Sequence, residues 1–160
     1  MNQFSHLDDE GQARMVDVGQ KATTHRVAVA SAQIQMEQAT VAAIRELGIA
    51  KGDVLQVARL AGIMAAKQTS ALIPLCHPIG LDSVEIEFEV ADSAIQVKAI
   101  ASVHGKTGVE MEALTAVTVT ALTIYDMCKS MDRAMKITDV QLEKKSGGKS
   151  GDFHRKDNDS

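Results

Sequence analysis

The sequence predicts an α+β fold of the ferredoxin-like type, in which β-α-β-β-α-β elements form an antiparallel sheet with helices on one face, with one extra helix. Three observations support this prediction. Two neighbouring segments alternate between apolar and polar residues, as the strands of a hairpin do. Two helical patterns precede this hairpin, and a long apolar run of helical character follows it. A doubly wound parallel sheet would need more strands than these patterns supply.

The first strand is predicted from His25 to Met36, where apolar residues alternate imperfectly with polar ones. A short helix is expected from Thr40 to Leu47. Gly48 should end this helix, because glycine readily adopts the left-handed conformation that follows a helix C-terminus.

A second helical run extends from Val54 to Ile73, with Asp53 as its N-cap and Pro74 as the residue that ends it. Its apolar residues recur at helical spacing, as in an amphipathic helix: Val54, Val57, Leu60 and Ile63 or Met64.

The hairpin is predicted from the segments Leu81 to Val90 and Ile95 to Val103, joined by a turn at 91–93. In the first of these strands, three glutamates alternate with apolar residues, which predicts one solvated face. The long helix follows within the stretch Gly105 to Lys129. A last, weaker strand is expected from Ile137 to Leu142.

Length and composition fit one domain, because 160 residues are enough to bury a sizeable core. Hydrophobic residues make up 45% of the chain but aromatic residues only 2%, so small and aliphatic side chains and eight methionines must fill that core. We expect a flexible N-terminal segment at residues 1–14, a single ferredoxin-like domain at 15–153 and a flexible tail at 154–160.

The formal net charge of −4 and the pI near 5.7 argue against a broad surface for nucleic acid or for an anionic membrane. The first twenty residues contain no apolar run like that of a signal peptide, and no segment approaches the ~20 apolar residues that span a bilayer. Together with only two cysteines, these features predict a cytoplasmic protein.

Two fragments match the end of a phosphate-binding P-loop: Gly105-Lys106-Thr107 and Gly148-Lys149-Ser150. The full motif also requires an earlier glycine, and those positions hold Ile100 and Glu143. Neither fragment is therefore a P-loop by pattern. The surrounding segment, Lys145 to Gly151, could be a mobile clamp for phosphates or a solvated linker, and its composition favours the linker.

The loop from Ile73 to Pro78 holds Cys76 and His77 between two prolines, which restrict where the imidazole can point. A stiff loop that presents histidine indicates a site, but a surface histidine beside a buried cysteine explains the pattern equally well. A zinc site is disfavoured, because the two residues are adjacent rather than spaced as chelating ligands and Cys128 has no second ligand nearby. No metal site is predicted.

The long helix carries charged residues only at its ends. Glu110 and Glu112 at its start could cap the helix or line a site. Asp126 and Lys129, three residues apart, could form an exposed ion pair, although the apolar run before them favours partial burial and proton exchange near neutral pH. Glu112 and Asp126 are ~21 Å apart along a straight helix, so a single site containing both would need a two-fold dimer with antiparallel helices.

Three long strings, which occur in this order, carry a family resemblance: KGDVLQVARLAGIMAAKQTSALIPLCHP, GKTGVEMEALTAVTVTALTIYDMCK and KSGGKSGDF. They resemble the cyclic pyranopterin monophosphate synthase family of molybdenum cofactor biosynthesis. The resemblance extends from about Met15 to Phe153. It implies a ferredoxin-like fold, a homohexamer built as a trimer of dimers, and active sites at subunit interfaces.

The reaction implied by the resemblance is a lyase reaction. A 3′,8-cyclised dihydro-GTP is rearranged to a pterin-type tricycle, and pyrophosphate leaves as the cyclic phosphate forms. No redox cofactor is implied, and a divalent ion could accompany the triphosphate. The only partners expected are this nucleotide-derived substrate and further copies of the chain, with no nucleic acid and no membrane.

The resemblance also assigns residues. Asp126 corresponds to the catalytic acid/base and Lys129 to its proton-transfer partner, and Lys51 and His77 suit further proton transfers. The expected substrate-binding residues are Leu75, Cys76, His77, Met111, Glu112, Glu110, Lys67, Lys145, Arg26 and Asp17. Lys51, Lys67 and Lys145 are cations suited to the triphosphate.

Two other functions are consistent with parts of the sequence. An atypical NTPase would use the GKT or GKS fragment and would release phosphate from ATP or GTP in the presence of magnesium. A nucleotide-binding hexameric scaffold would use the charged residues only as caps and ion pairs, and would tolerate alanine at Lys51, His77 and Asp126.

Overall fold

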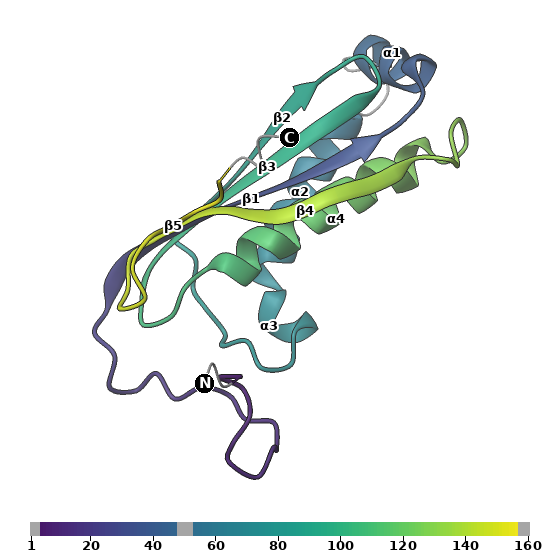
Figure 1. Cartoon of the computed structure of the whole chain (residues 1–160). Helices are drawn as coiled ribbons and strands as arrows, with labels where there is room; N and C mark the ends of the chain where they lie inside the picture. Colours follow the sequence, from purple (N-terminus) through teal and green to yellow (C-terminus); the bar gives the residue numbers. More distant parts are fainter. Residues whose placement is uncertain (1–3, 48–52, 157–160) are drawn as a thin grey trace.

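The computed structural model describes residues 4–47 and 53–156 and has an α+β fold with a five-stranded antiparallel sheet (Figure 1). The strands are β1 (Thr24–Gln35), β2 (Ser83–Val90), β3 (Ala94–Gly105), β4 (Lys136–Ser146) and β5 (Phe153–His154). The helices are α1 (Gln38–Leu47), α2 (Val54–Lys67), α3 (Thr69–Leu72) and α4 (Glu110–Cys128). No helix of the described ranges is long and apolar enough to cross a membrane.

The sheet order is β2-β3-β1-β4-β5, and the central strand β1 pairs with both β3 and β4. The predicted hairpin is confirmed as β2 and β3, which pair antiparallel from Ser83 opposite Ser102 to Val90 opposite Ile95. The glutamates of β2 are exposed, as the alternation predicts, while Ile86 is buried on the other face.

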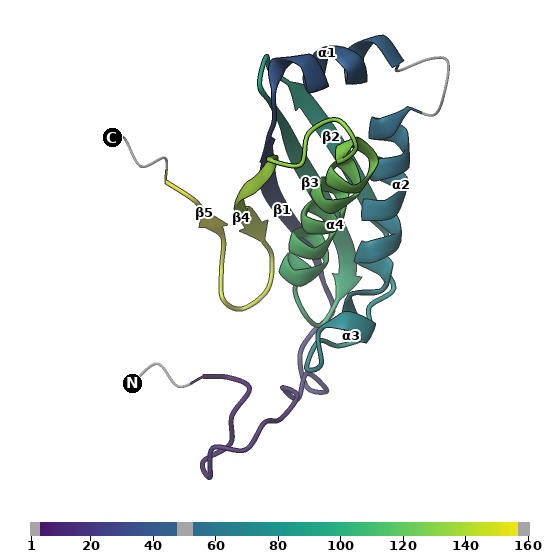
Figure 2. The same ribbon diagram turned by 90° about the vertical axis from the view of Figure 1, so that its right-hand side faces the viewer.

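The helices α2 and α4 lie side by side on one face of the sheet, and Figure 2 shows α4 in front of the strands with α2 beside it. The core between these layers is made of small aliphatic side chains. Ala28, Ala30 and Ala32 of β1 are fully buried, and so are Ala113 and Ala116 of α4. Because the chain has few aromatic residues, close approach of the backbones replaces bulky side chains in filling this space.

The second helical run begins as predicted, since Asp53 Oδ1 accepts hydrogen bonds from the backbone N–H groups of Leu55 and Gln56 at 3.0 and 3.2 Å. Its predicted end at Pro74 is wrong, because the helix stops at Lys67 and only the four-residue α3 follows before the proline. Gly48, predicted to end α1, lies outside the described residues.

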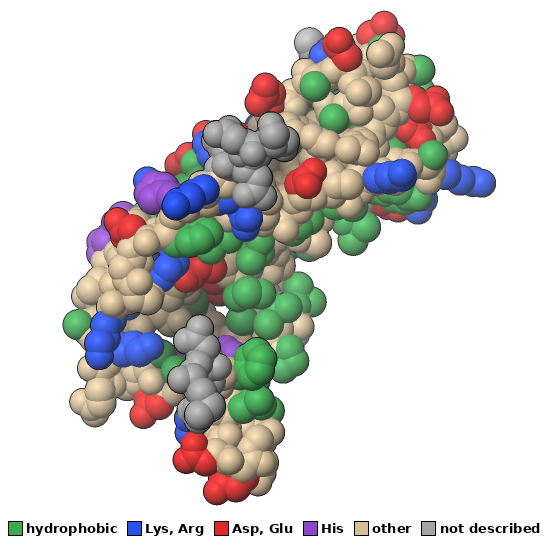
Figure 3. Space-filling view, in the orientation of Figure 1, with side chains coloured by type: hydrophobic (Ala, Val, Ile, Leu, Met, Phe, Trp, Pro, Cys, Tyr) green, Lys and Arg blue, Asp and Glu red, His purple; other side chains and the backbone are tan. Residues whose placement is uncertain are grey.

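Only part of the predicted apolar stripe of α2 packs, since Val54 and Ile63 are partly buried against the core. Val57, Leu60 and Met64 are 44%, 59% and 57% exposed, whereas Ala58, Gly62, Ala65 and Ala66 are buried. Small residues allow α2 to approach α4 closely, and Val57, Leu60 and Met64 are then left on the outside. Figure 3 shows hydrophobic side chains gathered on the helical side of the molecule, near α3.

The last predicted strand is longer than expected, since β4 extends from Lys136 to Ser146 and is interrupted by register shifts opposite β1. The glycine-rich segment is not a solvated linker, which corrects the interpretation favoured by its composition. It forms the turn of a hairpin between β4 and β5, in which Lys145 pairs with Phe153.

Candidate active site

Three strand ends and one helix start meet at one end of the sheet. Because β1 is antiparallel to both of its neighbours, its first residue, Thr24, lies opposite Gly105 at the end of β3, and Val27 lies opposite Ser146 at the end of β4. The loop after β3 leads directly into α4 at Glu110. Residues from four distant parts of the sequence therefore surround one cleft.

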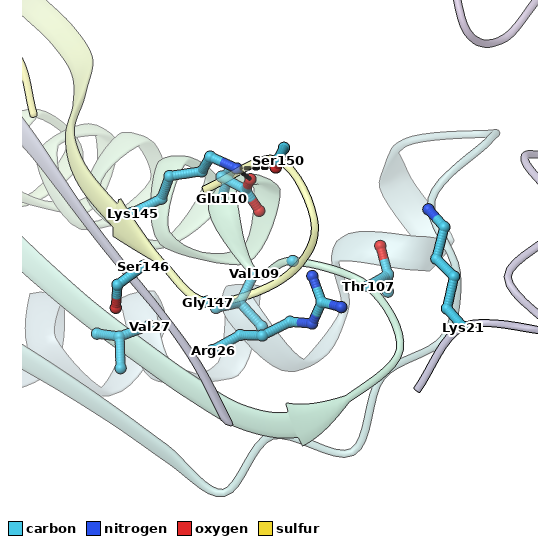
Figure 4. A pocket seen from close by; sticks show the side chains of 11 residues that line it. Lys21, Arg26, Val27, Thr107, Val109, Glu110, Lys145, Ser146, Gly147 and Ser150 are labelled. Atoms are coloured by element: carbon cyan, nitrogen blue, oxygen red, sulfur yellow. Dashed lines mark hydrogen bonds and ion pairs between the residues drawn. The ribbon is translucent and has the colours of Figure 1, made fainter. Parts of the chain in front are cut away.

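One part of this cleft is a cavity of about 140 Å³ lined by three cations (Figure 4). Lys145 Nζ lies 3.9 Å from Glu110 Oε1 and also donates a hydrogen bond to Ser150 Oγ. Arg26 donates from Nε to the carbonyl of Gly105 at 3.0 Å, which fixes its guanidinium against the loop after β3. Lys21 lines the opposite side of the cavity. Such a pocket suits a multiply charged anion.

The turn after β4 is held close to this cavity by glycines with positive φ. Gly147 has φ +87°, and a Cβ there would lie 2.2 Å from the carbonyl oxygen of His25. Gly148 has φ +84°, and a Cβ there would lie 2.2 Å from a guanidinium nitrogen of Arg26. Both glycines are therefore required for the turn to lie against β1.

A second cavity of about 400 Å³ adjoins the first, since both are lined by Lys21, Thr107, Gly108 and Glu110. Glu112 lines this cavity and is only 3% exposed. Burial, with a smaller contribution from the charge of Glu110, raises the pKa of Glu112 to about 7. Glu112 lies in the first turn of α4, and a hydrogen bond from its own backbone N–H lowers its pKa, but burial outweighs this effect.

The loop with Cys76 and His77 lines the same cavity, together with Leu75 and Met111. His77 Nε2 donates a hydrogen bond to the backbone carbonyl of Val16 at 2.8 Å. The pKa of the Cys76 thiol is raised, mainly by burial and also by the charge of Glu112. Of the two interpretations left open by the sequence, this geometry favours a loop that belongs to a site.

Asp126 and Lys129 lie at the other end of α4, away from this cleft. They form an ion pair at 2.5 Å, and their side chains are 68% and 56% exposed. Partial burial of Asp126 is therefore not found in the single chain. The hydrogen bond to Asp126 raises the pKa of Lys129.

The remaining predicted residues are placed as follows. Asp17 lines a shallow hollow of about 870 Å³ beside the first cavity, together with Arg26 and Lys149. Lys67 is exposed at the last residue of α2 and lines neither of the two cavities described above. Lys51 lies outside the described residues.

Sequence reasoning missed Lys21, which lines both cavities and the hollow. It also missed the role of Lys106, whose Nζ donates to the carbonyl of Gly19 at 2.8 Å rather than facing the cation-lined cavity. The segment around Lys21 has no periodicity that would place it against the sheet, so only the fold could show its position. Among the described residues, no group of three or more His, Cys, Asp or Glu side chains is arranged to hold a metal ion.

Comparisons with known proteins identify the family of the chain. The model of the MoaC family matches residues 15–148. The chain is 55% identical to a protein of Peptoclostridium acidaminophilum, over 96% of this chain and 98% of the relative. It is 57% identical to one of Novosphingobium aromaticivorans (94% and 96% covered) and 54% identical to one of Heliobacterium modesticaldum (98% and 100% covered). All three relatives are named cyclic pyranopterin monophosphate synthase. The chain belongs to the MoaC family.

Proposed function

We propose that this protein is a lyase that converts 3′,8-cyclo-7,8-dihydro-GTP to cyclic pyranopterin monophosphate and pyrophosphate, a step of molybdenum cofactor biosynthesis. The name shared by its relatives supports this proposal. The observation that carries it is the cleft itself, which joins a cation-lined cavity to a cavity with a buried, protonatable carboxyl group. The substrate has two corresponding parts: a triphosphate, which cations can bind, and a base, which must exchange protons.

The cation-lined cavity is proposed to bind the triphosphate. A ribose hydroxyl gives up its proton to a base or to water as it attacks the innermost phosphorus, the bond from this phosphorus to the bridging oxygen breaks, and pyrophosphate departs with the negative charge. Lys145, Arg26 and Lys21 would neutralise the charge that develops on this leaving group. Arg26 is preorganised for this task, because its hydrogen bonds to Gly105 and Lys106 fix the guanidinium before substrate arrives.

The second cavity is proposed to bind the base-derived rings. Glu112, with a pKa of about 7, can accept or donate a proton at neutral pH. Leu75, Cys76, His77 and Met111 line the same space and would position the ring system.

The proton transfers at Asp126 and Lys129 are proposed to take place in an oligomer. Both residues are exposed in the single chain and lie at the opposite end of α4 from Glu112, ~21 Å away along the helix. A two-fold partner would bring Asp126 of one copy to the cleft of the other, and three such dimers would form the hexamer. The exposed apolar residues of α2 support an assembly of this kind. Lys51 and Lys67 are proposed to join the site from the same interface.

The P-loop type of NTPase receives no support from the geometry, because the Lys106 ammonium group is hydrogen-bonded to a backbone carbonyl and the GKS fragment lies in the turn between β4 and β5 rather than before a helix. A scaffold role does not require a cavity with a buried carboxyl group that adjoins a cavity lined by three cations. We propose that the reaction uses no redox cofactor, that a divalent ion would enter only with the triphosphate, and that the protein works in the cytoplasm, where nucleotides are made.

The decisive experiment supplies the purified protein with 3′,8-cyclo-7,8-dihydro-GTP and analyses the products by mass spectrometry. We expect a cyclic-phosphate pterin and an equal amount of pyrophosphate. Phosphate release from plain GTP without a pterin product would instead support the NTPase, and binding without any product would support the scaffold.

A further inference from the structure

We propose that Lys106 is a positioning residue that holds the N-terminal arm, residues 16–21, on the cleft and thereby presents Lys21 as a binding residue for the triphosphate. This inference rests on the proposed function, since it assigns Lys21 to the same substrate. It also gives a role to the GKT fragment, whose lysine does not act as a P-loop lysine.

The N-terminal arm is attached to the cleft at two points. His77 Nε2 donates to the Val16 carbonyl at 2.8 Å, and Lys106 Nζ donates to the Gly19 carbonyl at 2.8 Å. Between these points, Asp17 Oδ1 accepts a hydrogen bond from the backbone N–H of Gly19 at 2.7 Å, which closes a local turn. Both anchoring side chains come from segments that border the proposed site.

The second anchor determines where Lys21 lies. The backbone N–H of Lys21 donates to the Val18 carbonyl at 3.1 Å, so the turn that contains Gly19 leads directly to Lys21. Figure 4 shows Lys21 on the side of the cation-lined cavity opposite Lys145. A triphosphate between them would therefore meet positive charge from both sides.

Lys106 is well placed to act as an anchor, because its own backbone is fixed. Arg26 Nη2 donates to the Lys106 carbonyl at 3.2 Å, and Lys106 follows directly after the last residue of β3. The same arginine lines the cavity, so the arm, the loop after β3 and the cavity wall are connected through two side chains. Loss of the Lys106 side chain would release Gly19 without removing a cavity cation.

The kinetic test compares Lys21→Met, Lys106→Met and the double variant with the wild type. We expect Lys21→Met to raise KM about tenfold, the effect of one charged hydrogen bond. Lys106→Met should raise KM about threefold to tenfold with little change in kcat, and Lys106→Arg should restore KM, because arginine can also donate to a carbonyl. The double variant should be no worse than Lys21→Met alone. Additive losses would overturn the positioning role, since Lys106 would then act on substrate directly.

A second measurement follows the arm without relying on activity. Trypsin can cleave after Arg14, which precedes the N-terminal arm and is exposed. We expect Lys106→Met to speed this cleavage several-fold. Lys98→Met is the matched control, because Lys98 Nζ also donates one exposed hydrogen bond, to Glu87 at 3.0 Å, but lies on the open face of the sheet. The control should cleave like the wild type.

Failure of the anchoring role of Lys106 and failure of the proposed function would give different results. Equal cleavage rates in Lys106→Met and the wild type would overturn the anchoring role, whatever the activity of the enzyme. Faster cleavage in Lys106→Met together with a wild type that is inactive on the cyclised dihydro-GTP would overturn the proposed function, and with it the binding role of Lys21, but would support the anchor.

Discussion

Glu112 and Asp126 are carboxylates of the same helix with opposite surroundings. Glu112 is 3% exposed beside a cavity, and Asp126 is 68% exposed with a lysine partner. Removal from water penalises the charged form of Glu112, whereas the charged form of Asp126 is paired with Lys129. At neutral pH, Glu112 is therefore suited to exchange protons within the single chain.

Glu112 should make the stability of the protein depend on pH. Its pKa is raised from 4.5 to about 7 in the folded chain, so the native state binds more protons than the unfolded chain between these values. The free energy of unfolding therefore falls as pH rises from about 5 to about 8. Glu112→Gln should remove this fall. The difference in free energy of unfolding between the variant and the wild type should therefore shift in favour of the variant by roughly 2–3 kcal/mol from the lower to the upper end of the pH range.

Urea denaturation of both proteins across this pH range measures the difference. Parallel curves for Glu112→Gln and the wild type would show that Glu112 titrates normally in the folded protein. Asp139→Asn serves as a control, because Asp139 is an exposed carboxylate on β4.

Asp126→Asn should abolish turnover while leaving nucleotide binding largely intact. The variant keeps the shape of the side chain and can still accept a hydrogen bond from Lys129, but it cannot take up a proton. We expect kcat to fall by a factor of about 100 or more, the usual contribution of an acid/base group. Turnover is measured by pyrophosphate release and binding by calorimetry with GTP. Retained turnover would refute the catalytic assignment.

The packing of α2 on α4 depends on one glycine. A Cβ at Gly62 would lie 2.0 Å from Thr120 Oγ1 and 3.1 Å from the carbonyl oxygen of Ala116. The two helices can approach this closely only because neither presents a large side chain at the contact. The same closeness explains why Val57, Leu60 and Met64 of α2 are on the outside.

Gly62→Ala should therefore destabilise the protein, although alanine favours helices. The added methyl group forces α2 away from α4, and we expect a loss of about 2 kcal/mol or more in the free energy of unfolding. Thr120→Ala in the same chain removes the hydroxyl at 2.0 Å and should restore part of the loss. Gly80→Ala is the control, because nothing lies within 4 Å of its added Cβ. Thermal unfolding of the four proteins tests this, and an unchanged Gly62→Ala would contradict the close contact.

At the scale of the whole molecule, the cleft and the ion pair lie at opposite ends of one helix. Both are assigned to the proposed reaction, and in the proposed dimer a single chain would supply two halves of different sites. The cation-lined cavity, the cavity of Glu112 and the N-terminal arm are all at the end where β1 begins. The exposed apolar residues Leu60, Met64 and Leu122 lie on the two helices that connect these ends.

A subunit-mixing experiment tests this arrangement. Asp126→Asn and Glu112→Gln should each have little activity alone. When they are co-expressed, half of the two-fold dimers contain one copy of each, and one of the two sites in such a dimer has both native groups. Activity should then recover to about a quarter of the wild-type value, because half of the dimers are mixed and half of the sites in a mixed dimer are intact. Mixed oligomers that remain as inactive as the parent variants would show that each site lies within one chain.

The sequence alone determined the order of the main elements from β1 to β4, although not α3 or β5. It also determined the β2–β3 hairpin, the cap at Asp53 and the family, because periodicity, capping and long motifs depend on neighbouring residues. Only the tertiary structure decided which face of α2 packs, since this depends on how closely α4 approaches. It also decided that the glycine-rich segment is a hairpin turn. It also decided which side chains meet in one cleft: Lys21, Arg26, Lys145 and Glu112. They meet because of which strand ends share an edge of the sheet, and no local pattern contains that information.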